Sequence, residues 1–472
     1  MIVRVPKIDE QGNFVDAGKD AVAKVHLGIT VNVCSPEFGA DPSGKQDSTE
    51  AIQTAVDHVA DLGGGTVVVP GGVYRVSPPF IALRGYVTVR GDGIGSTIFV
   101  IDSAQVTTAT EETGVFHTGT YRKAVTDKTL FRTTLRDFSI YTSYANGNIA
   151  RSGLGAYQHI ALEHMNSRVW GVVYNTYLGE HPAEPDAVHT VENLEIWDTA
   201  GGMALLGLDD QGCKVNNLRV RRTLKQGLLV GKPFDHPESA SSSTGGRAIG
   251  AADNKFLHAD ISDANLGQVG CAGIEVYTSQ TKFVNSTSWY NRRHQQDIYS
   301  PVTYAQRAQS SYDRFDRLRD GAGWYIFGTR NIFSGCTAQE NGGHGFVVVG
   351  SQTQLMGCIG ESSSYYDTAG TKDSQNLGIF VNTAANFYIT NWAQLTQMWG
   401  CRAQNVYELG QGAKYGFYIE NYIKKFRLRD GLTFQSKDSS AQTNVVPVGS
   451  MLGEGSLIEI DNRVYGADRV AS

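Results

Sequence analysis

Short runs of alternating apolar residues, each opened by a glycine, recur along the chain beyond residue 130. They are Gly171–Tyr174, Gly202–Leu206, Gly227–Val230, Gly273–Tyr277, Gly323–Phe327, Gly345–Val349, Gly378–Val381 and Gly416–Ile419. Their starts lie 31, 25, 46, 50, 22, 33 and 38 residues apart. The spacing of 22 matches one coil of a β-solenoid, while 46 and 50 suggest two coils plus an insertion. Because no long helical pattern separates the runs, they predict an all-β parallel β-helix rather than a βα barrel.

Alternation along these runs separates the side chains into two faces. If the residue after each glycine points inward, the inner set is Val172, Met203, Leu228, Ile274, Trp324, Phe346, Ile379 and Phe417. The opposite face, called the outward stripe below, then contains Val173, Ala204, Leu229, Glu275, Tyr325, Val347, Phe380 and Tyr418, and two residues further on Asn175, Leu206, Tyr277, Phe327, Asn382 and Glu420. So many aromatic rings are unusual on a solvent-exposed surface. Because aromatic rings stack on the apolar faces of sugars, the stripe is interpreted as a glycan track. The alternatives are a subunit interface and a surface that long loops cover.

Residues 38–100 predict a helix laid over the start of the β structure. Asp47 followed by Glu50 is typical of a capping box, and apolar residues then recur at helical spacing, so we expect a helix over residues 47–61. The run Gly63–Gly65 ends it, because glycine adopts the left-handed conformation without a side-chain clash. Two short strands are expected next, at Thr66–Val69 and Val73–Val76.

This stretch, FGADPSG…DSTEAIQTAVD…GGGTVVVPGGVY, resembles the opening of pectate-lyase-superfamily proteins. These are right-handed parallel β-helices, and they include phage tailspike depolymerases, polysaccharide lyases, glycanases and epimerases. The resemblance covers roughly the first fifth of the chain and implies the fold, whereas one fold hosts many reactions. We therefore expect a lead-in or attachment segment over residues 1–30, the β-helix over 31–430, and a C-terminal β or irregular segment over 431–472.

Composition narrows the possible partners. The chain has 472 residues and a net charge of −6, which disfavours nucleic-acid binding because such binding needs a basic face. The N-terminus has no apolar run of signal-peptide length, and no apolar stretch is long enough to span a membrane. We expect a component of a phage tail, or a secreted protein, whose residues 1–30 contact other tail proteins.

The cysteines show a second sign of repetition. They are Cys34, Cys213, Cys271, Cys336, Cys358 and Cys401, and they contain no CxxC pair or zinc-binding spacing. The last three each follow a glycine and look like one position repeated at intervals of 22 and 43 residues, the second interval suggesting two repeats. We expect reduced, buried thiols stacked along the solenoid, with disulfides as the alternative.

Three long insertions offer places for a functional site, because loops on a rigid scaffold concentrate binding and catalysis. They are residues 179–186, 232–247 and 292–320, and each is expected to leave the solenoid just after the outward stripe. The alternatives are plain surface loops or contacts with a neighbouring subunit.

Glycoside hydrolysis needs two carboxylates around the bond, one of them kept protonated. Asp209 and Asp210 follow a strand of the outward stripe and are weakly similar to the Asp-Asp pair of polygalacturonase-like hydrolases, although the companion motifs are missing. Glu275 points outward one or two coils away, close enough to pair across a sugar. These three are the predicted catalytic residues, with turn-forming or ordinary surface carboxylates as the alternative. The expected substrate-binding residues are Tyr277, Tyr325, Phe327, Lys232, His236 and Arg247.

A polysaccharide lyase would instead neutralise a uronate with a cation and remove a proton with a base. The candidates for those two tasks are Lys232, His236, Arg247, Arg292, Arg293, His294, Tyr277 and Tyr325. The resemblance to phage tail depolymerases implies a homotrimeric polysaccharide depolymerase, for which we expect no metal or cofactor, and we favour a hydrolase over a lyase. The alternatives are a non-catalytic structural or receptor-binding tail protein and a uronate epimerase.

Overall fold

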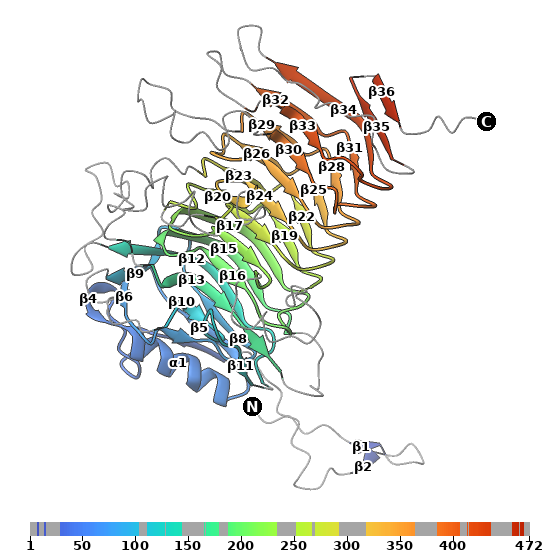
Figure 1. The fold of residues 1–472 in the computed structure, drawn as a ribbon. Helices are drawn as coiled ribbons and strands as arrows, with labels where there is room; N and C mark the ends of the chain where they lie inside the picture. The colour runs from blue at the N-terminus through green and yellow to red at the C-terminus, as the bar shows by residue number, and fades with distance from the viewer. Residues whose placement is uncertain are drawn as a thin grey trace, which may run out of the picture.

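The computed structural model describes residues 7–8, 14–15, 29–102, 111–127, 129–143, 165, 167–178, 187–233, 252–266, 270–291, 318–363, 385–405, 413, 415–435, 456–461 and 463–466. Within these residues the chain forms one helix, α1, and otherwise β-strands that wind into an elongated solenoid (Figure 1). The helix lies at the N-terminal end of the solenoid, and β34, β35 and β36 lie at the other end. The predicted parallel β-helix is confirmed. No helix in the described part of the chain is long and apolar enough to cross a membrane.

A ten-stranded parallel sheet runs the length of the solenoid, with one strand from each coil. Each strand is hydrogen-bonded to the equivalent strand of the neighbouring coil, on both sides except at the two ends of the sheet. In spatial order the strands are β7 (Ile81–Ala82), β10 (Thr113–His117), β13 (Val169–Tyr174), β16 (Met203–Leu205), β18 (Leu228–Val230), β21 (Ile274–Val276), β24 (Trp324–Ile326), β27 (Phe346–Val348), β30 (Ala385–Ile389) and β33 (Tyr415–Ile419).

A second parallel sheet closes each coil, and it bends in the middle. One row of strands contains β19 (Lys255–Leu257), β22 (Lys282–Val284), β25 (Ile332–Ser334), β28 (Gln354–Met356) and β31 (Gln397–Trp399), and the next row contains β20 (Asp260–Ser262), β23 (Thr287–Trp289), β26 (Thr337–Gln339), β29 (Ile359–Glu361) and β32 (Arg402–Asn405). The longer strands β12 (Thr134–Ser143), β15 (Thr190–Thr199), β17 (Lys214–Thr223) and β34 (Arg427–Gln435) run through both rows. One residue with positive φ makes the bend in each coil, so Asn or Gly recurs there, as in Asn285, Gly335, Gly357 and Gly400.

The remaining strands build the two ends of the solenoid. The N-terminal coils use β3 (Ile29–Asn32), β4 (Ser43–Asp47), β5 (Gly65–Val68), β6 (Gly72–Val76), β8 (Val87–Arg90) and β9 (Thr97–Asp102). Two further pairs are β1 (Lys7–Ile8) with β2 (Phe14–Val15) and β11 (Val125–Thr126) with β14 (Thr176–Tyr177). At the other end β35 (Leu457–Ile460) pairs in parallel with β34 and antiparallel with β36 (Arg463–Gly466).

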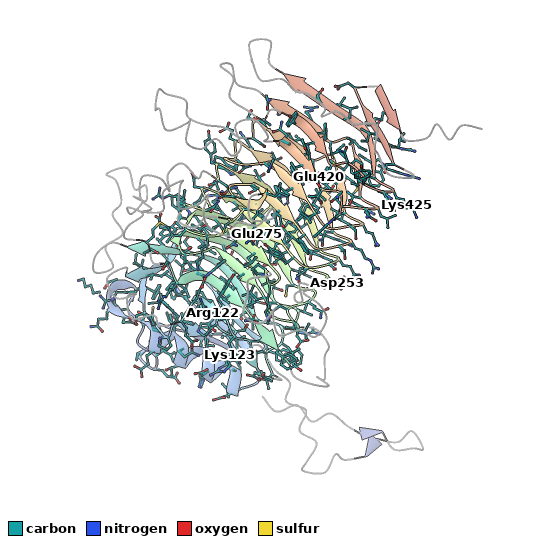
Figure 2. The ribbon with its side chains drawn as sticks, in the orientation of Figure 1. Arg122, Lys123, Asp253, Glu275, Glu420 and Lys425 are labelled. Atoms are coloured by element: carbon teal, nitrogen blue, oxygen red, sulfur yellow. The ribbon has the colours of Figure 1, made fainter. Side chains whose placement is uncertain are left out.

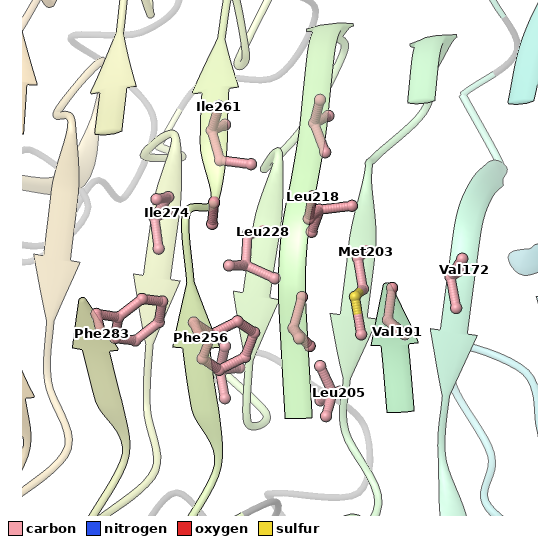
Figure 3. Packing of buried hydrophobic residues seen from close by; sticks show 14 of the residues in the cluster. Val172, Val191, Met203, Leu205, Leu218, Leu228, Phe256, Ile261, Ile274 and Phe283 are labelled. Atoms are coloured by element: carbon pink, nitrogen blue, oxygen red, sulfur yellow. The ribbon is translucent and has the colours of Figure 1, made fainter. Parts of the chain in front are cut away.

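The interior of the solenoid is filled by stacked side chains from equivalent positions. Figure 3 shows Phe256 beside Phe283, and Leu228 beside Ile274, on successive coils. The rings of Phe256, Phe283 and Phe333 stack with centroids 4.5 and 5.3 Å apart. The predicted inner set is confirmed for its seven described members, which all belong to one buried core, namely Val172, Met203, Leu228, Ile274, Trp324, Phe346 and Phe417. Ile379 lies outside the described residues.

The number of coils differs from the prediction. β18 pairs directly with β21, and β21 pairs directly with β24, so the intervals of 46 and 50 residues are each a single coil with an insertion. The predicted run Gly378–Val381 lies outside the described residues, and the sheet strand of that coil is β30, in which Phe387 pairs with Phe346. An insertion has no fixed length, so spacing alone could not distinguish a long coil from two short ones.

The three repeated cysteines occupy one position on successive coils, and they are buried, reduced thiols as predicted. Cys336, Cys358 and Cys401 have no exposed surface, and all six cysteines of the chain are free thiols. The Sγ atoms of Cys358 and Cys401 lie 3.6 Å from the carbonyl oxygens of Phe333 and Leu355. Because β28 pairs directly with β31, the interval of 43 residues is one coil and not two.

Helix α1 (Thr49–Asp61) covers the open end of the core with its buried face, as the periodicity predicts. Ile52, Ala55, Val56 and Val59 belong to the same core as the solenoid interior. The predicted capping box is wrong, because the helix begins two residues later than expected. Asp47 accepts a hydrogen bond from the Thr49 backbone N–H (2.8 Å), and the cap residue Ser48 instead accepts one from the backbone of Asp41 (3.0 Å).

Candidate functional site

The outward stripe forms the outer face of the ten-stranded sheet, and most of it is covered. Ala204, Leu229, Tyr325 and Val347 are at most 1% exposed, and they pack in one cluster with Leu318 from the turn before β24. The interpretation of the stripe as an exposed glycan track is therefore wrong for the strands from β16 to β27. The alternative of a covered surface describes this part of the stripe, because alternation assigns a side of the sheet and says nothing about access to water.

Glu275 lies in this covered face, near the middle of the solenoid (Figure 2), and its carboxylate is fully buried. Its Oε1 accepts a hydrogen bond from the backbone N–H of Ala272 (2.8 Å), and its Oε2 accepts one from the hydroxyl of Tyr277 (2.9 Å). The guanidinium of Arg319 donates to the same hydroxyl (2.7 Å) and lies 3.9 Å from the carboxylate. We call Glu275, Tyr277 and Arg319 the outer-face triad.

Burial dominates the electrostatics of the triad. It raises the pKa of Glu275 above the usual glutamate value, although Arg319, the Ala272 amide, Tyr277 and Gln226 each favour the charged form. Burial likewise raises the pKa of Tyr277 well above its ordinary value. The arrangement can therefore hold a neutral carboxyl group in contact with a neutral phenol and a guanidinium.

Asp209 and Asp210 are placed differently, and the structure does not bring them to Glu275. In register, Ala204 and Glu275 lie on the same row with Leu229 between them, so Asp209 is two coils away and five residues further along its coil. Asp209 accepts a hydrogen bond from the backbone of Leu178 (2.7 Å).

The carboxylate of Asp210 is inside the coil. It accepts a hydrogen bond from the backbone of Gly207 (2.7 Å), and it lies 3.4 Å from His189 Nε2. The imidazole of His189 stacks on Tyr174, a member of the interior core. Both aspartates therefore support a turn in this structure, and the expected pairing of Asp209 or Asp210 with Glu275 across a sugar does not fit the register.

The other predicted residues divide into two groups. Tyr325 and Phe327 pack around Tyr277, with ring centroids 5.8 and 6.0 Å from it. Lys232 follows β18 and is 9% exposed. The remaining candidates lie outside the described residues, namely His236, Arg247, Arg292, Arg293 and His294.

The insertions do not all leave from the place that the sequence suggested. Residues 179–186 come after β13 and the short strand β14, and the segment that begins at Lys232 follows β18, so both come after the part of their coil that contains the outward stripe. The third insertion, residues 292–320, instead joins β23 to β24, so it leads into the N-terminal end of a strand of the ten-stranded sheet. That position explains how Arg319 reaches Glu275, which precedes it by 44 residues in the chain.

A second polar cluster, which sequence reasoning missed, lies on the outer face of the bent sheet. Arg219 lies between Glu195 and Asp260 on three neighbouring strands, 3.3 and 3.9 Å from the two carboxylates. Arg221 also pairs with Asp260 (2.7 Å), and its guanidinium lies 4.7 Å from the ring centre of Trp289. Alternation along β15 and β17 marks these positions as outward, but their partners lie on other coils and only the strand register shows that they meet.

A cavity beside α1 and the side chains that could bind a metal were the other possible ligand sites. A cavity of about 650 Å³ lies between α1 and the start of the ten-stranded sheet, with Glu50, Phe80, Arg84 and His117 among its lining residues. Burial lowers the pKa of His117, so its imidazole is neutral at physiological pH. In the described part of the chain, no three His, Cys, Asp or Glu side chains come together in a way that could hold a metal ion.

One family model matches the N-terminal part of the solenoid. Residues 30–228 match the family model described as rhamnogalacturonase A/epimerase, pectate lyase-like. A stretch of 68 residues is 44% identical to mannuronan C5-epimerase AlgE1 and 41% identical to alginate lyase 7, both from Azotobacter vinelandii. These matches cover 13% of this chain and only 5% and 8% of the two relatives.

Solved structures extend the likeness to almost the whole chain. The A-module of mannuronan C-5 epimerase AlgE4 from Azotobacter vinelandii is 15% identical and superposes with a TM-score of 0.50, covering 91% of this chain and 100% of that module. The enzymatically active domain of bacteriophage CBA120 tailspike protein 2 is 11% identical, with a TM-score of 0.53 over 94% of this chain and 53% of that domain. At these identities the superpositions establish a shared fold.

Proposed function

We propose that this pectate-lyase-like parallel β-helix protein is an enzyme that acts on a polysaccharide and that the outer-face triad is its reactive centre. The observation that carries the proposal is Glu275, a fully buried carboxyl group whose pKa burial raises, in contact with Tyr277 and Arg319. A carboxyl group with a strongly perturbed pKa and specific partners is typical of a functional site. Two relatives are named for reactions on polysaccharides, a mannuronan C5-epimerase and an alginate lyase, and one fold neighbour is named as the enzymatically active domain of a tailspike, which supports a polysaccharide substrate.

In the favoured scheme Glu275 is a general acid in the cleavage of a glycosidic bond. Because its carboxyl group has no exposed surface, the scheme requires the side chains that cover this face to move aside when a substrate binds. A carboxyl group with a raised pKa retains its proton to a higher pH, and it can donate that proton to the leaving oxygen while water adds to the anomeric carbon and releases a proton to solvent. Tyr277 positions the carboxyl group through its hydroxyl (2.9 Å), and Arg319 holds that hydroxyl in place (2.7 Å). Asp209 and Asp210, both tied to the backbone, are proposed as supports of their turn and not as the second carboxylate.

The second candidate is chemistry at C5 of a uronate, either β-elimination or epimerisation. The epimerase and lyase relatives favour it, and Arg319 is a cation that could neutralise a uronate carboxylate. It ranks second because the proposed base, Tyr277, has a pKa raised by burial, so its phenolate form is rare.

The test is to incubate the purified protein with alginate, pectate and bacterial surface polysaccharides and to analyse the products. New reducing ends without ultraviolet absorption indicate hydrolysis, whereas the absorption of an unsaturated uronate indicates β-elimination, and a changed uronate composition at constant chain length indicates epimerisation. Glu275→Gln should lower the rate roughly 10²- to 10⁴-fold, which is typical for the loss of a general acid. Glu192→Gln, in an exposed ion pair with Arg136, is the matched control.

Two outcomes would contradict the proposal. If Glu275→Gln retains full activity, the triad is not the reactive centre. If the protein binds a polysaccharide and no product forms from any of them, the alternative of a non-catalytic, receptor-binding tail protein replaces the enzyme.

Assembly and location belong to the same proposal. The likeness to a phage tailspike supports a homotrimer in a virion tail, and a secreted enzyme is the alternative. Light scattering on the purified protein tests the trimer directly, and a monomer at micromolar concentration would refute it.

A further inference from the structure

The last two coils of the ten-stranded sheet expose aromatic side chains, in contrast to the covered face around Glu275. The rings of Tyr388 and Tyr418 stack with centroids 4.7 Å apart and planes 10° from parallel, and both residues are only partly buried. In the turns that follow, Trp392 is 53% exposed and Tyr422 is 61% exposed. These four side chains are called the aromatic rungs below.

Register places the aromatic rungs in two equivalent pairs. Tyr388 pairs with Tyr418 in the sheet, and Trp392 and Tyr422 each follow four residues later. The next residue in each turn, Ala393 or Ile423, is in the solenoid core, so the two turns have the same orientation. Neighbouring coils are separated by about 4.8 Å, so the pairs form a short ladder parallel to the solenoid axis.

Glu420 fixes this ladder. Its Oε1 accepts a hydrogen bond from the Tyr388 hydroxyl (2.7 Å), and its Oε2 accepts one from the backbone of Asn391 (3.0 Å). The carboxylate of one coil therefore orients a ring and a turn of the coil before it. Rings that are held in place before binding lose little conformational entropy when a ligand stacks on them.

We propose that the aromatic rungs bind sugar rings of a polysaccharide chain that lies along the solenoid axis. Exposed rings stack on the apolar faces of sugars, and the Glu420 carboxylate beside them can accept hydrogen bonds from hydroxyl groups. A partner protein fits less well, because a stable protein interface buries about 800 Å² on each side and the ladder offers only a few exposed side chains.

The inference rests on the proposed function for its role in catalysis. Glu275 and the aromatic rungs belong to the same outer face, with β24 and β27 between β21 and β30. Figure 2 shows Glu275 near the middle of the solenoid and Glu420 towards its C-terminal end. Three coils correspond to about 14 Å, so only a substrate several sugars long can reach both places. Long chains should therefore be preferred over short ones, because binding energy from remote sugars lowers the barrier only when those sugars are present.

The experiment measures polymer binding and cleavage separately. Binding is measured in the Glu275→Gln background by calorimetry, with alginate, pectate and bacterial surface polysaccharides as probes. The variant Trp392→Ala/Tyr422→Ala should weaken the Kd for the bound polymer roughly ten- to hundredfold, which corresponds to about three- to tenfold for each ring. Leu395→Ala, which removes an exposed aliphatic side chain from the same turn, should leave the Kd unchanged. In the active protein, the double variant should also reduce the preference in kcat/KM for polymer over a trisaccharide of the same sugar.

The outcomes separate this inference from the proposed function. An unchanged Kd in the double variant, or binding of no probe by the parent protein, overturns the inference. A change in oligomeric state in place of the Kd also overturns it, since the rungs would then be a contact between copies of the chain. Loss of binding in the double variant of a protein that cleaves nothing supports the rungs and refutes the enzyme.

Discussion

Replacing Tyr277 by phenylalanine removes a single oxygen atom from the outer-face triad. That oxygen donates a hydrogen bond to Glu275 (2.9 Å) and accepts one from Arg319 (2.7 Å). The ring itself keeps its packing against Tyr325 and Phe327, so the hydrophobic contribution to stability is unchanged. Any loss of stability therefore reports on the two hydrogen bonds.

The magnitude follows from the burial of the partners. Glu275 has no exposed surface and Tyr277 is 2% exposed, so water cannot replace the lost hydroxyl. The Tyr277 hydroxyl accepts a hydrogen bond from the charged Arg319 guanidinium and donates one to Glu275. A hydrogen bond to a charged group contributes roughly 1.5–3 kcal/mol to stability, and Glu275 keeps its other donors, so we expect Tyr277→Phe to cost about 2–4 kcal/mol.

The cost should also depend on pH. Because burial raises the pKa of Glu275, the folded chain retains a proton that the unfolded chain has released. The free energy of unfolding therefore falls as pH rises from the ordinary glutamate pKa of 4.5 through the raised folded value. In Tyr277→Phe the charged carboxylate loses a donor, its folded pKa rises further, and the fall continues to higher pH. The difference between the two proteins should thus be larger at about pH 8 than at about pH 4.

Urea denaturation of both proteins at the two pH values checks this reasoning, with stability read from the midpoint at constant slope. Tyr174→Phe is the matched control. It also removes the hydroxyl of a buried tyrosine, but the hydrogen bond described for that hydroxyl is a long one (3.5 Å) from the neutral Thr133 hydroxyl. Equal midpoints for Tyr277→Phe and the parent, or a difference that does not vary with pH, would refute the coupling between Tyr277 and Glu275.

Three further predictions test the solenoid. A Cβ at Gly400 would meet nothing within 4 Å, but the backbone there has φ = +57°, which alanine adopts less easily than asparagine. In urea denaturation, Gly400→Ala should therefore lower the free energy of unfolding by about 1 kcal/mol, and Gly400→Asn should lower it less. A larger loss for Gly400→Asn would contradict the bend at positive φ. Phe283→Ala opens the centre of the ring stack and should cost about 3–5 kcal/mol in the same assay, whereas a cost below about 1 kcal/mol would mean that the stack is not tightly packed. A water-soluble thiol reagent should label the three stacked cysteines only after unfolding, because Cys336, Cys358 and Cys401 are buried and burial raises the pKa of the Cys358 thiol. Rapid labelling of these cysteines in the native protein would contradict their stacking.

Much of the fold could be predicted because a solenoid repeats its physics locally. Alternation identified the inner set, and the recurrence of Gly before Cys identified a stack of buried thiols, since each depends on a residue and its immediate neighbours. The coil count failed where an insertion lengthens a coil, as between β18 and β21. Hydrogen bonding between coils determines which strands are neighbours, and the length of chain between them does not.

The site was less predictable because its contacts are not local. Alternation correctly placed Glu275 on the outer face. It could not predict the packing of Leu318 and Tyr325 that covers this face. Arg319 comes from an insertion that leads into the N-terminal end of β24, and nothing in its neighbouring residues indicates that it meets Glu275. The adjacent pair Asp209 and Asp210 drew attention as a motif, whereas in the structure both carboxylates accept hydrogen bonds from the backbone.

The solenoid supplies its own comparison for Glu275. In register with it on neighbouring strands are Ala204, Leu229, Tyr325 and Val347, all buried in the same face. None of these residues carries a charge, so the sheet and its covering do not require a carboxylate at this position. A buried charged network is also weak support for stability, because desolvation opposes the attraction between its members. The carboxylate at position 275 therefore calls for an explanation in function.

If the triad serves function and not stability, two variants should differ in a specific way. Glu275→Leu alone leaves Arg319 and Tyr277 buried without that carboxylate, and removing one member of a buried pair typically costs about 3–5 kcal/mol. The triple variant Glu275→Leu/Tyr277→Phe/Arg319→Met replaces the whole triad by apolar groups. Its gain in desolvation should offset the lost acceptor of the Ala272 N–H, so it should remain within about 2 kcal/mol of the parent protein. If urea midpoints show the triple variant to be less stable than Glu275→Leu, the triad is a structural element of the solenoid and its proposed role in catalysis fails; if the triple variant is stable and inactive, the triad exists for function.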